Sequence, residues 1–200
     1  TGTGKSILCK ILCSSILAKK AASLLIFDMH QEYGMFSKTD NSPGLKFFFP
    51  SAVEIFTLDP EENREARPLL IDPVEITPSD LIIAFQDLSP AMIDAIYTVQ
   101  GRKRGRSLVE AIKNAEPEDY EGRLHVAALQ ALKRRVERLN RFIFIRPSTG
   151  DVFSQITGLI KAEKSIVLDF GRFGQDSTAY LFIANLLSRR LYDLYTEQSS

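Results

Sequence analysis

Apolar and polar residues follow two different periodicities along this chain, and each periodicity predicts one kind of element. Apolar residues at helical spacing predict helices over 6–19 and 151–161 and a last helix beyond residue 175. Short apolar runs predict strands over 22–28, 47–49, 53–58, 69–76, 142–145 and 165–170. Alternation of helices and strands is typical of an α/β fold with a parallel sheet.

The stretch from Pro78 to Asn140 interrupts this alternation, because it contains helical signals only. Ser89-Pro90 and Ser107 are typical helix starts, and a later helix carries apolar residues along one face. We therefore predict one domain in three stretches. These are a core over 1–76, a helical insertion over 77–141 and a continued core over 142–200.

The chain opens on Thr1-Gly2-Thr3-Gly4-Lys5-Ser6, which closes the phosphate-binding pattern G-x-x-x-x-G-K-[ST]. Glycines let the backbone approach a phosphate, and the amides of the turn and of the next helix attract its charge. Lys5 supplies a cation for the β- and γ-phosphates of ATP, and the Ser6 hydroxyl is a ligand for Mg²⁺. The predicted ATP-binding residues are Gly2, Thr3, Gly4, Lys5, Ser6 and Ile7. We expect the first glycine of the pattern, and the strand that feeds the loop, to lie before Thr1.

Composition restricts the class of protein only weakly. The 200 residues are 44% hydrophobic, enough for a sizeable core, and 25 basic residues balance 25 acidic ones. No apolar run approaches the roughly 20 residues of a membrane-spanning helix. The two cysteines, Cys9 and Cys13, lie one helical turn apart, which favours reduced thiols over a disulfide or a metal site. A cytoplasmic location is the simplest interpretation.

Two predicted strands end in an aspartate, at Asp28 and at Asp169. Ligands bind at the carboxyl ends of parallel strands, where an acid can hold Mg²⁺ through water in the manner of a Walker B residue. Both aspartates are candidates for that role. A solvated strand end is the alternative for each.

The residues after Asp28 favour a functional role for this strand end over a merely solvated one. Asp28-Met29-His30-Gln31-Glu32-Tyr33-Gly34 places two carboxylates, an imidazole and a phenol directly after a strand. This segment resembles the D-x-H-x-E-Y motif of HerA-like ATPases, in the HerA/FtsK branch of DNA-pumping motors. The opening hexapeptide resembles that family's T-G-S-G-K-S, with Thr3 for its serine. The helical insertion and the strand ending at Asp169 agree in pattern, so the resemblance covers most of the chain.

The resemblance implies a P-loop NTPase fold of the RecA/FtsK type, a parallel sheet flanked by helices. It implies an ATP-hydrolysing motor domain of a ring-forming translocase or helicase, usually hexameric, that acts on double-stranded DNA in processing or repair. It also implies a NurA-like nuclease or another effector subunit as partner. Asp28 and Glu32 are implied to lie near the nucleotide or a subunit contact.

One feature of the family is missing. Its Walker B strand ends in two acidic residues and follows the long helix, and no such strand occurs before Ser200. We therefore expect these 200 residues alone to hydrolyse ATP weakly or not at all. Asp169 is interpreted as a strand-end aspartate of the family, and a true Walker B role is the alternative.

Basic residues supply two further hypotheses. Arg172, in the turn after Asp169, is a candidate to reach a phosphate in cis or across a subunit boundary, and a solvated turn arginine is the alternative. Segment 101–141 holds eleven Lys/Arg and six Asp/Glu, an excess suited to DNA phosphates. A solvated face paired with the acidic stretch 116–121 is the simpler interpretation of that segment.

The predicted catalytic residues are Lys5, Asp28, Glu32, Asp169 and Arg172, with Ser6 and Asp28 as candidate Mg²⁺ ligands. His30 is the better placed of the two histidines to hydrogen-bond a carboxylate near the phosphates. Two other functions fit the same motifs. One is a conjugative or secretion-type ATPase of the superfamily, and the other is an ATP-binding regulatory module of a defence complex.

Overall fold

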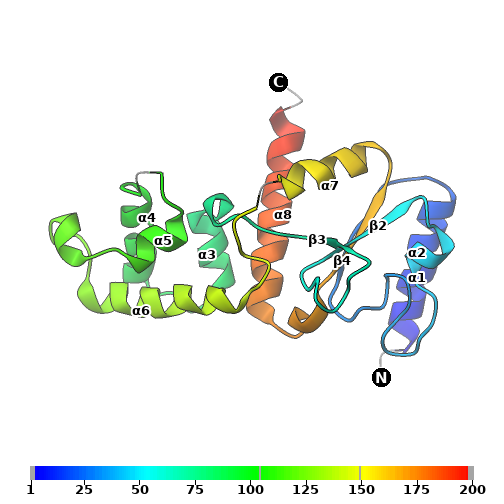
Figure 1. Cartoon of the computed structure of the whole chain (residues 1–200), viewed down its shortest axis with the longest axis horizontal. Helices are drawn as coiled ribbons and strands as arrows, with labels where there is room; N and C mark the ends of the chain where they lie inside the picture. Colours follow the sequence, from blue (N-terminus) through cyan, green and yellow to red (C-terminus); the bar gives the residue numbers. More distant parts are fainter. Residues whose placement is uncertain (1–2, 104, 149, 198–200) are drawn as a thin grey trace. The chain divides into compact units, whose positions relative to one another are not determined.

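The computed structural model describes residues 3–103, 105–148 and 150–197 (Figure 1). The chain forms two compact units. The sheet unit comprises Thr1–Leu69, Gly150–Asp176 and Arg190–Ser200, and the helical unit comprises Leu70–Thr149 and Ser177–Arg189.

The sheet unit contains a four-stranded, entirely parallel sheet with the order β1-β4-β2-β3. Its strands are β1 (Leu25–Asp28), β2 (Val53–Thr57), β3 (Arg67–Pro68) and β4 (Ser165–Asp169). Every residue of β4 is buried, as expected for a central strand of a parallel sheet that is covered on both faces. The predicted α/β class with a parallel sheet is confirmed.

Helices and one short turn of this unit precede, join or follow these strands. They are α1 (Thr3–Ala18), α2 (Leu45–Phe48), α7 (Val152–Lys161), η4 (Gly171–Phe173) and the end of α8 (Ser177–Glu197). Leu17 of α1 and Leu45 of α2 pack with Val53 and Val167 of the sheet in one buried cluster. This packing fixes α1 against the sheet through its C-terminal half.

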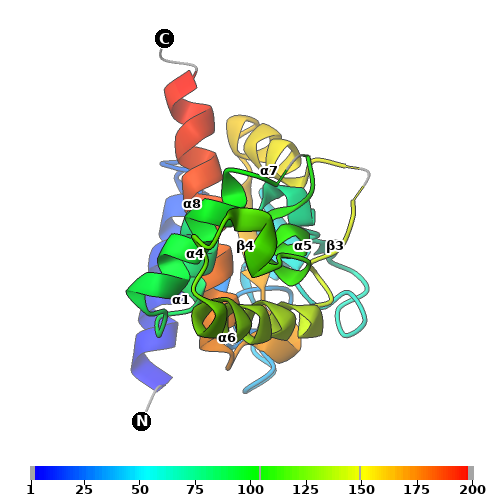
Figure 2. The same cartoon turned by 90° about the vertical axis from the view of Figure 1, so that its left-hand side faces the viewer.

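The helical unit contains α3 (Pro78–Ala84), α4 (Pro90–Gln100), α5 (Leu108–Lys113) and α6 (Val126–Glu137). Within this unit α6 runs beneath α4 and α5 (Figure 2). The predicted starts at Ser89 and Ser107 are confirmed, because each hydroxyl accepts a hydrogen bond from the amide three residues on. The buried carboxylate of Asp80 accepts from the Thr77 amide at 2.8 Å and binds Arg189 at 2.8 Å.

Two predicted strands are wrong. Phe47 and Phe48 lie in α2, because the amides of Leu45 and Lys46 bond to the carbonyls of Tyr33 and Gly34 and start a helical turn. The run 142–145 follows a 3-10 turn and forms one isolated bridge, between Ile145 and Ile71, instead of a strand.

The predicted strand over 69–76 is also wrong, because within this range the structure has only that bridge at Ile71 and a 3-10 turn at Pro73–Glu75, while β3 ends just before it at Pro68. Phe142 and Phe144 are buried as a stacked pair with ring centroids 5.1 Å apart. The apolar run over 142–145 is therefore explained by burial of its aromatic rings and not by pairing in a sheet.

Candidate functional site

The G-K-S residues lie in the first turn of α1, which begins at Thr3, earlier than the predicted start near Ser6. Lys5 is exposed and Ser6 is half-buried, and a Cβ placed on Gly4 would meet no atom within 4 Å. The N-terminal end of α1 and the carboxyl ends of β1 and β4 lie at the same edge of the sheet unit (Figure 1). Thr1 and Gly2 lie outside the described residues, as does the side chain of Thr3, and Ile7 is exposed.

Asp28 closes the turn that follows β1. Its two carboxylate oxygens accept hydrogen bonds from the amides of Glu32 and Tyr33, at 2.9 and 2.8 Å. The side chain is buried, and burial raises the pKa of this carboxyl although the two amides oppose the shift. Because the folded-state pKa is raised, the contribution of Asp28 to stability falls as pH rises through that value.

The turn after β1 is also attached to α1. Burial first, and then the nearby Cys9 thiol, raise the pKa of Tyr33 to about 12. The ammonium of Lys10 donates to the hydroxyl of Ser42 at 3.0 Å. Cys9 and Cys13 are free thiols, as predicted. The polar segment between β1 and α2 is therefore hydrogen-bonded, through Ser42, to the helix that carries Lys5.

Asp169 lies beside Asp28, because the two are register partners at the ends of β4 and β1. One oxygen of Asp169 accepts from the Thr57 hydroxyl at 3.3 Å and from the Asn63 side-chain amide at 2.9 Å. The other oxygen accepts from the Gly171 amide at 2.8 Å. Sequence reasoning missed Thr57 and Asn63, although the position of Thr57 at the end of a strand was a usable signal.

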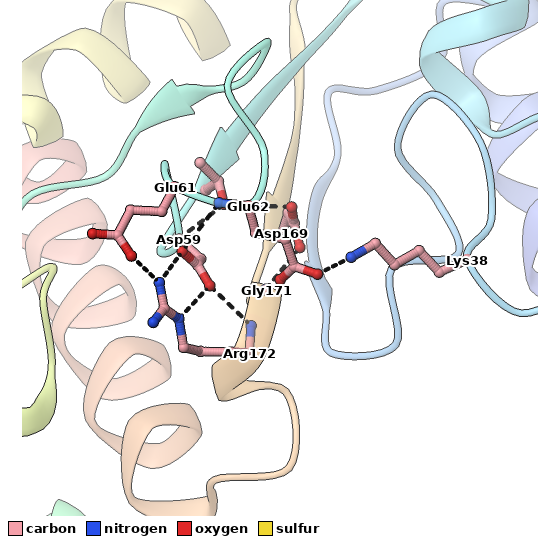
Figure 3. Close-up of polar contacts among 8 residues, drawn as sticks. Lys38, Asp59, Glu61, Glu62, Asp169, Gly171 and Arg172 are labelled. Atoms are coloured by element: carbon pink, nitrogen blue, oxygen red, sulfur yellow. Dashed lines mark hydrogen bonds and ion pairs between the residues drawn. The ribbon is translucent and has the colours of Figure 1, made fainter.

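Arg172 reaches from the turn after β4 to two carboxylates of the turn after β2 (Figure 3). Its Nε and Nη2 donate to the two oxygens of Asp59 at 2.6 and 2.7 Å, and Nη2 also donates to Glu61 at 2.5 Å. Hydrogen bonding to Arg172 lowers the pKa of Asp59, and the same bonds raise the pKa of Arg172. The ion pair therefore stabilises the fold above the ordinary aspartate pKa and is lost as pH falls through the lowered one.

A cavity of about 360 Å³ lies next to the two strand-end aspartates. Asp28, Asp169 and Asn63 line it together with Lys38 and Glu62, which form an ion pair between the turns after β1 and β2 (Figure 3). The structure therefore brings Asp28 and Asp169 together.

A second cavity, of about 280 Å³, is lined by His30, Glu32 and Arg172. Asp28, Glu32, Asp169 and Arg172 thus line these two cavities, whereas Lys5 and Ser6 line neither of them. The catalytic roles assigned to them from the sequence stay predictions.

Several basic residues of the helical unit are paired with acidic ones. Arg102 bonds the carboxylate of Glu121 at 3.0 Å and the carbonyl of Asp119 at 2.7 Å. Lys133 pairs with Glu116 at 3.1 Å. The predicted pairing of this surface with the acidic stretch is confirmed for these residues, whereas Arg104 lies outside the described residues.

Over residues 3–103, 105–148 and 150–197, no helix is both long and apolar enough to cross a membrane. In the same part of the chain, no three or more His, Cys, Asp or Glu side chains gather in a way that could hold a metal ion.

A parallel sheet with G-K-S at a helix start and acids at the carboxyl edge defines the chain as a P-loop nucleotide-binding domain. The family model described as "Helicase HerA, central domain" matches residues 1–191, and the chain belongs to this family. It is therefore a P-loop ATPase domain of the HerA/FtsK type. A search among curated proteins found no significant match.

Proposed function

We propose that this chain is the ATP-hydrolysing motor domain of a ring-forming DNA translocase or helicase that acts in DNA processing or repair. The observation that carries the proposal is the position of Lys5 and Ser6 in the first turn of α1, at the sheet edge where Asp28 and Asp169 end their strands. A helix start beside the carboxyl edge of a parallel sheet is where P-loop domains hold a triphosphate.

Each residue near that edge has a proposed role. The first amides of α1 and the ammonium of Lys5 hold the β- and γ-phosphates of ATP. The Ser6 hydroxyl is the proposed Mg²⁺ ligand, and Asp28 and Asp169 orient water around the ion. The half-buried Ser6 and the pair of neighbouring carboxylates have the oxygen donors that Mg²⁺ prefers. Bound Mg²⁺ would neutralise charge on the phosphates.

The proposed partners follow from the family. We propose a homohexamer that encloses double-stranded DNA without reading its sequence, together with a NurA-like nuclease or another effector subunit. Because the total charge of the chain is balanced, DNA contact would depend on a few cations that face the pore. Lys103 and Arg106 belong to the same turn as the paired Arg102 and are the cations of the helical unit that we propose for this contact.

Substitution of Gly4 separates a nucleotide-binding role from a structural one. A Cβ at Gly4 has open space within the protein, so Gly4→Ala should leave the stability unchanged or raise it by up to about 1 kcal/mol, the preference of helices for alanine. A phosphate that approaches the backbone at this position has no room for the added methyl group. We expect binding of a fluorescent ATP analogue by the intact protein to weaken by at least tenfold, about 1.4 kcal/mol.

The matched control is Gly158→Ala in α7, where a Cβ also meets no atom within 4 Å. This variant should bind the analogue as the wild type does. Equal affinity in Gly4→Ala and Gly158→Ala would remove the nucleotide site from the start of α1. Loss of thermal stability in Gly4→Ala would mean that the glycine has a structural role.

A further inference from the structure

The ion pair between Arg172 and Asp59 is held in place by the surrounding backbone. Asp59 is fully buried, and it also accepts hydrogen bonds from the backbone amides of Arg172 and Glu62. Gly171 has a positive φ of 52°, and a Cβ at this residue would overlap the Cβ of Asp59. The turns after β2 and β4 therefore approach each other as closely as a glycine allows, and this approach sets where the guanidinium lies.

The guanidinium of Arg172 is only partly used. It has five N–H donors, of which three go to Asp59 and Glu61. Nη1 has no hydrogen-bond partner among the described residues. Arg172 is half exposed and lines the cavity of about 280 Å³ together with His30, Gln31, Thr39 and Glu32. An immobilised cation with two free donors next to a polar cavity suits a phosphate oxyanion.

The two carboxylates that hold Arg172 differ in burial. The side chain of Asp59 is 1% exposed, whereas that of Glu61 is 72% exposed. An exposed ion pair contributes little and exchanges readily, because water and salt screen it. Separation of Asp59 from Arg172, in contrast, is costly, because it leaves the buried carboxylate of Asp59 without a compensating charge. The structure therefore has one permanent and one exchangeable partner for the same arginine.

We propose that Asp59 is a positioning residue that fixes Arg172 to bind the terminal phosphate of a nucleoside triphosphate, and that Glu61 occupies Arg172 until that phosphate replaces it. This inference rests on the proposed function and adds a regulation to the same site. When the phosphate enters, Nη2 exchanges Glu61 for a phosphate oxygen and Nη1 donates to a second one. The bidentate pair with Asp59 stays in place throughout.

The test compares ATP and ADP, because the two nucleotides differ only in the terminal phosphate. Fluorescent analogues of both are titrated into the intact protein, and steady-state kcat and KM for ATP are measured in parallel. Glu61→Gln removes the competing carboxylate, so affinity for the ATP analogue should rise by up to about fivefold with no change for ADP. Arg172→Ala should weaken the preference for ATP over ADP, part of which Lys5 retains, and lower kcat by at least about a hundredfold.

Asp59→Asn leaves Arg172 present but unfixed. We expect kcat to fall by about ten- to a hundredfold with little change in ADP affinity, since a misplacement of about 1 Å is enough for such a loss. Millimolar ethylguanidinium should partly restore turnover of Arg172→Ala, because Asp59 can hold the free cation. The same compound should not rescue the double variant of Arg172→Ala and Asp59→Asn, a difference that a merely structural role for Asp59 does not predict.

Glu163→Gln is the matched control, because Glu163 is an exposed acid of the sheet unit at the start of β4, at the opposite edge of the sheet. The proposal is overturned if Glu61→Gln and Glu163→Gln give the same ATP affinity, a result that does not depend on whether Asp59→Asn folds. It is also overturned if ethylguanidinium rescues the single and the double variant equally. If Lys5→Ala still hydrolyses ATP, the proposed function fails instead.

Discussion

Lys5→Ala should reduce kcat for ATP hydrolysis by the intact protein by roughly 10²–10³-fold, the loss typical of removing one preorganised electrostatic contact to the reacting group. Lys5 is exposed in the first turn of α1, and its side chain makes no hydrogen bond or ion pair among the described residues. Alanine is also the best helix former. The fold should therefore be intact while the cation at the phosphates is lost. Phosphate release measured under saturating ATP gives the rate, and far-ultraviolet circular dichroism gives the helix content.

Lys19→Ala is the control for this experiment, because it removes another exposed lysine, just beyond the far end of α1. Its kcat should match that of the wild type. Turnover of Lys5→Ala at the wild-type rate would contradict the assignment of the nucleotide to the start of α1. A fall in both variants to the same extent would mean that net charge, and not a phosphate contact, explains the loss.

Gly171→Ala should destabilise the protein by about 2–4 kcal/mol, the range for backbone strain combined with steric overlap. The positive φ of Gly171 is unfavourable for alanine, and the new methyl group would overlap the side chain of Asp59. The amide of Gly171 also donates to Asp169, so a shift of this turn disturbs the carboxyl edge of β4. The urea midpoint of unfolding should fall and ATP turnover should fall with it.

Gly158→Ala provides the comparison, since this glycine lies inside α7 with open space around it. There the substitution should stabilise the protein by up to about 1 kcal/mol. Equal effects of the two substitutions would show that the turns after β2 and β4 can separate freely. In that event the interlocked geometry of Asp59, Gly171 and Arg172 would not constrain the site.

Local sequence signals predicted the two strands that end in an aspartate, the partly buried edge strand β1 and the fully buried β4. The runs that end at Asp28 and Asp169 are short, apolar and followed by turns, and both are strands in one parallel sheet. The same rule failed for Phe47 and Phe48, which are largely exposed in α2. Aromatic residues that cover a surface or stack in pairs give the same local pattern as a strand, so apolar runs alone cannot distinguish these cases.

The partners of the site residues could not be predicted in the same way. Arg172 was placed correctly in the turn after β4, yet Asp59 lies 113 residues away along the chain and no local pattern connects the two. Asn63 and Thr57 are likewise joined to Asp169 only by the order of the strands. Sequence patterns identified residues whose side chains can bind or react, and the sheet topology determines which of them meet.

The most direct test of the proposed motor function is steady-state ATP turnover by the intact protein, with Mg²⁺, in the presence and absence of linear duplex DNA at low salt. A duplex-driven motor domain predicts turnover that requires Mg²⁺, rises when the duplex is added and loses that rise as salt screens the phosphates. No turnover under any of these conditions, or turnover that the duplex leaves unchanged at low salt, would contradict the proposed function.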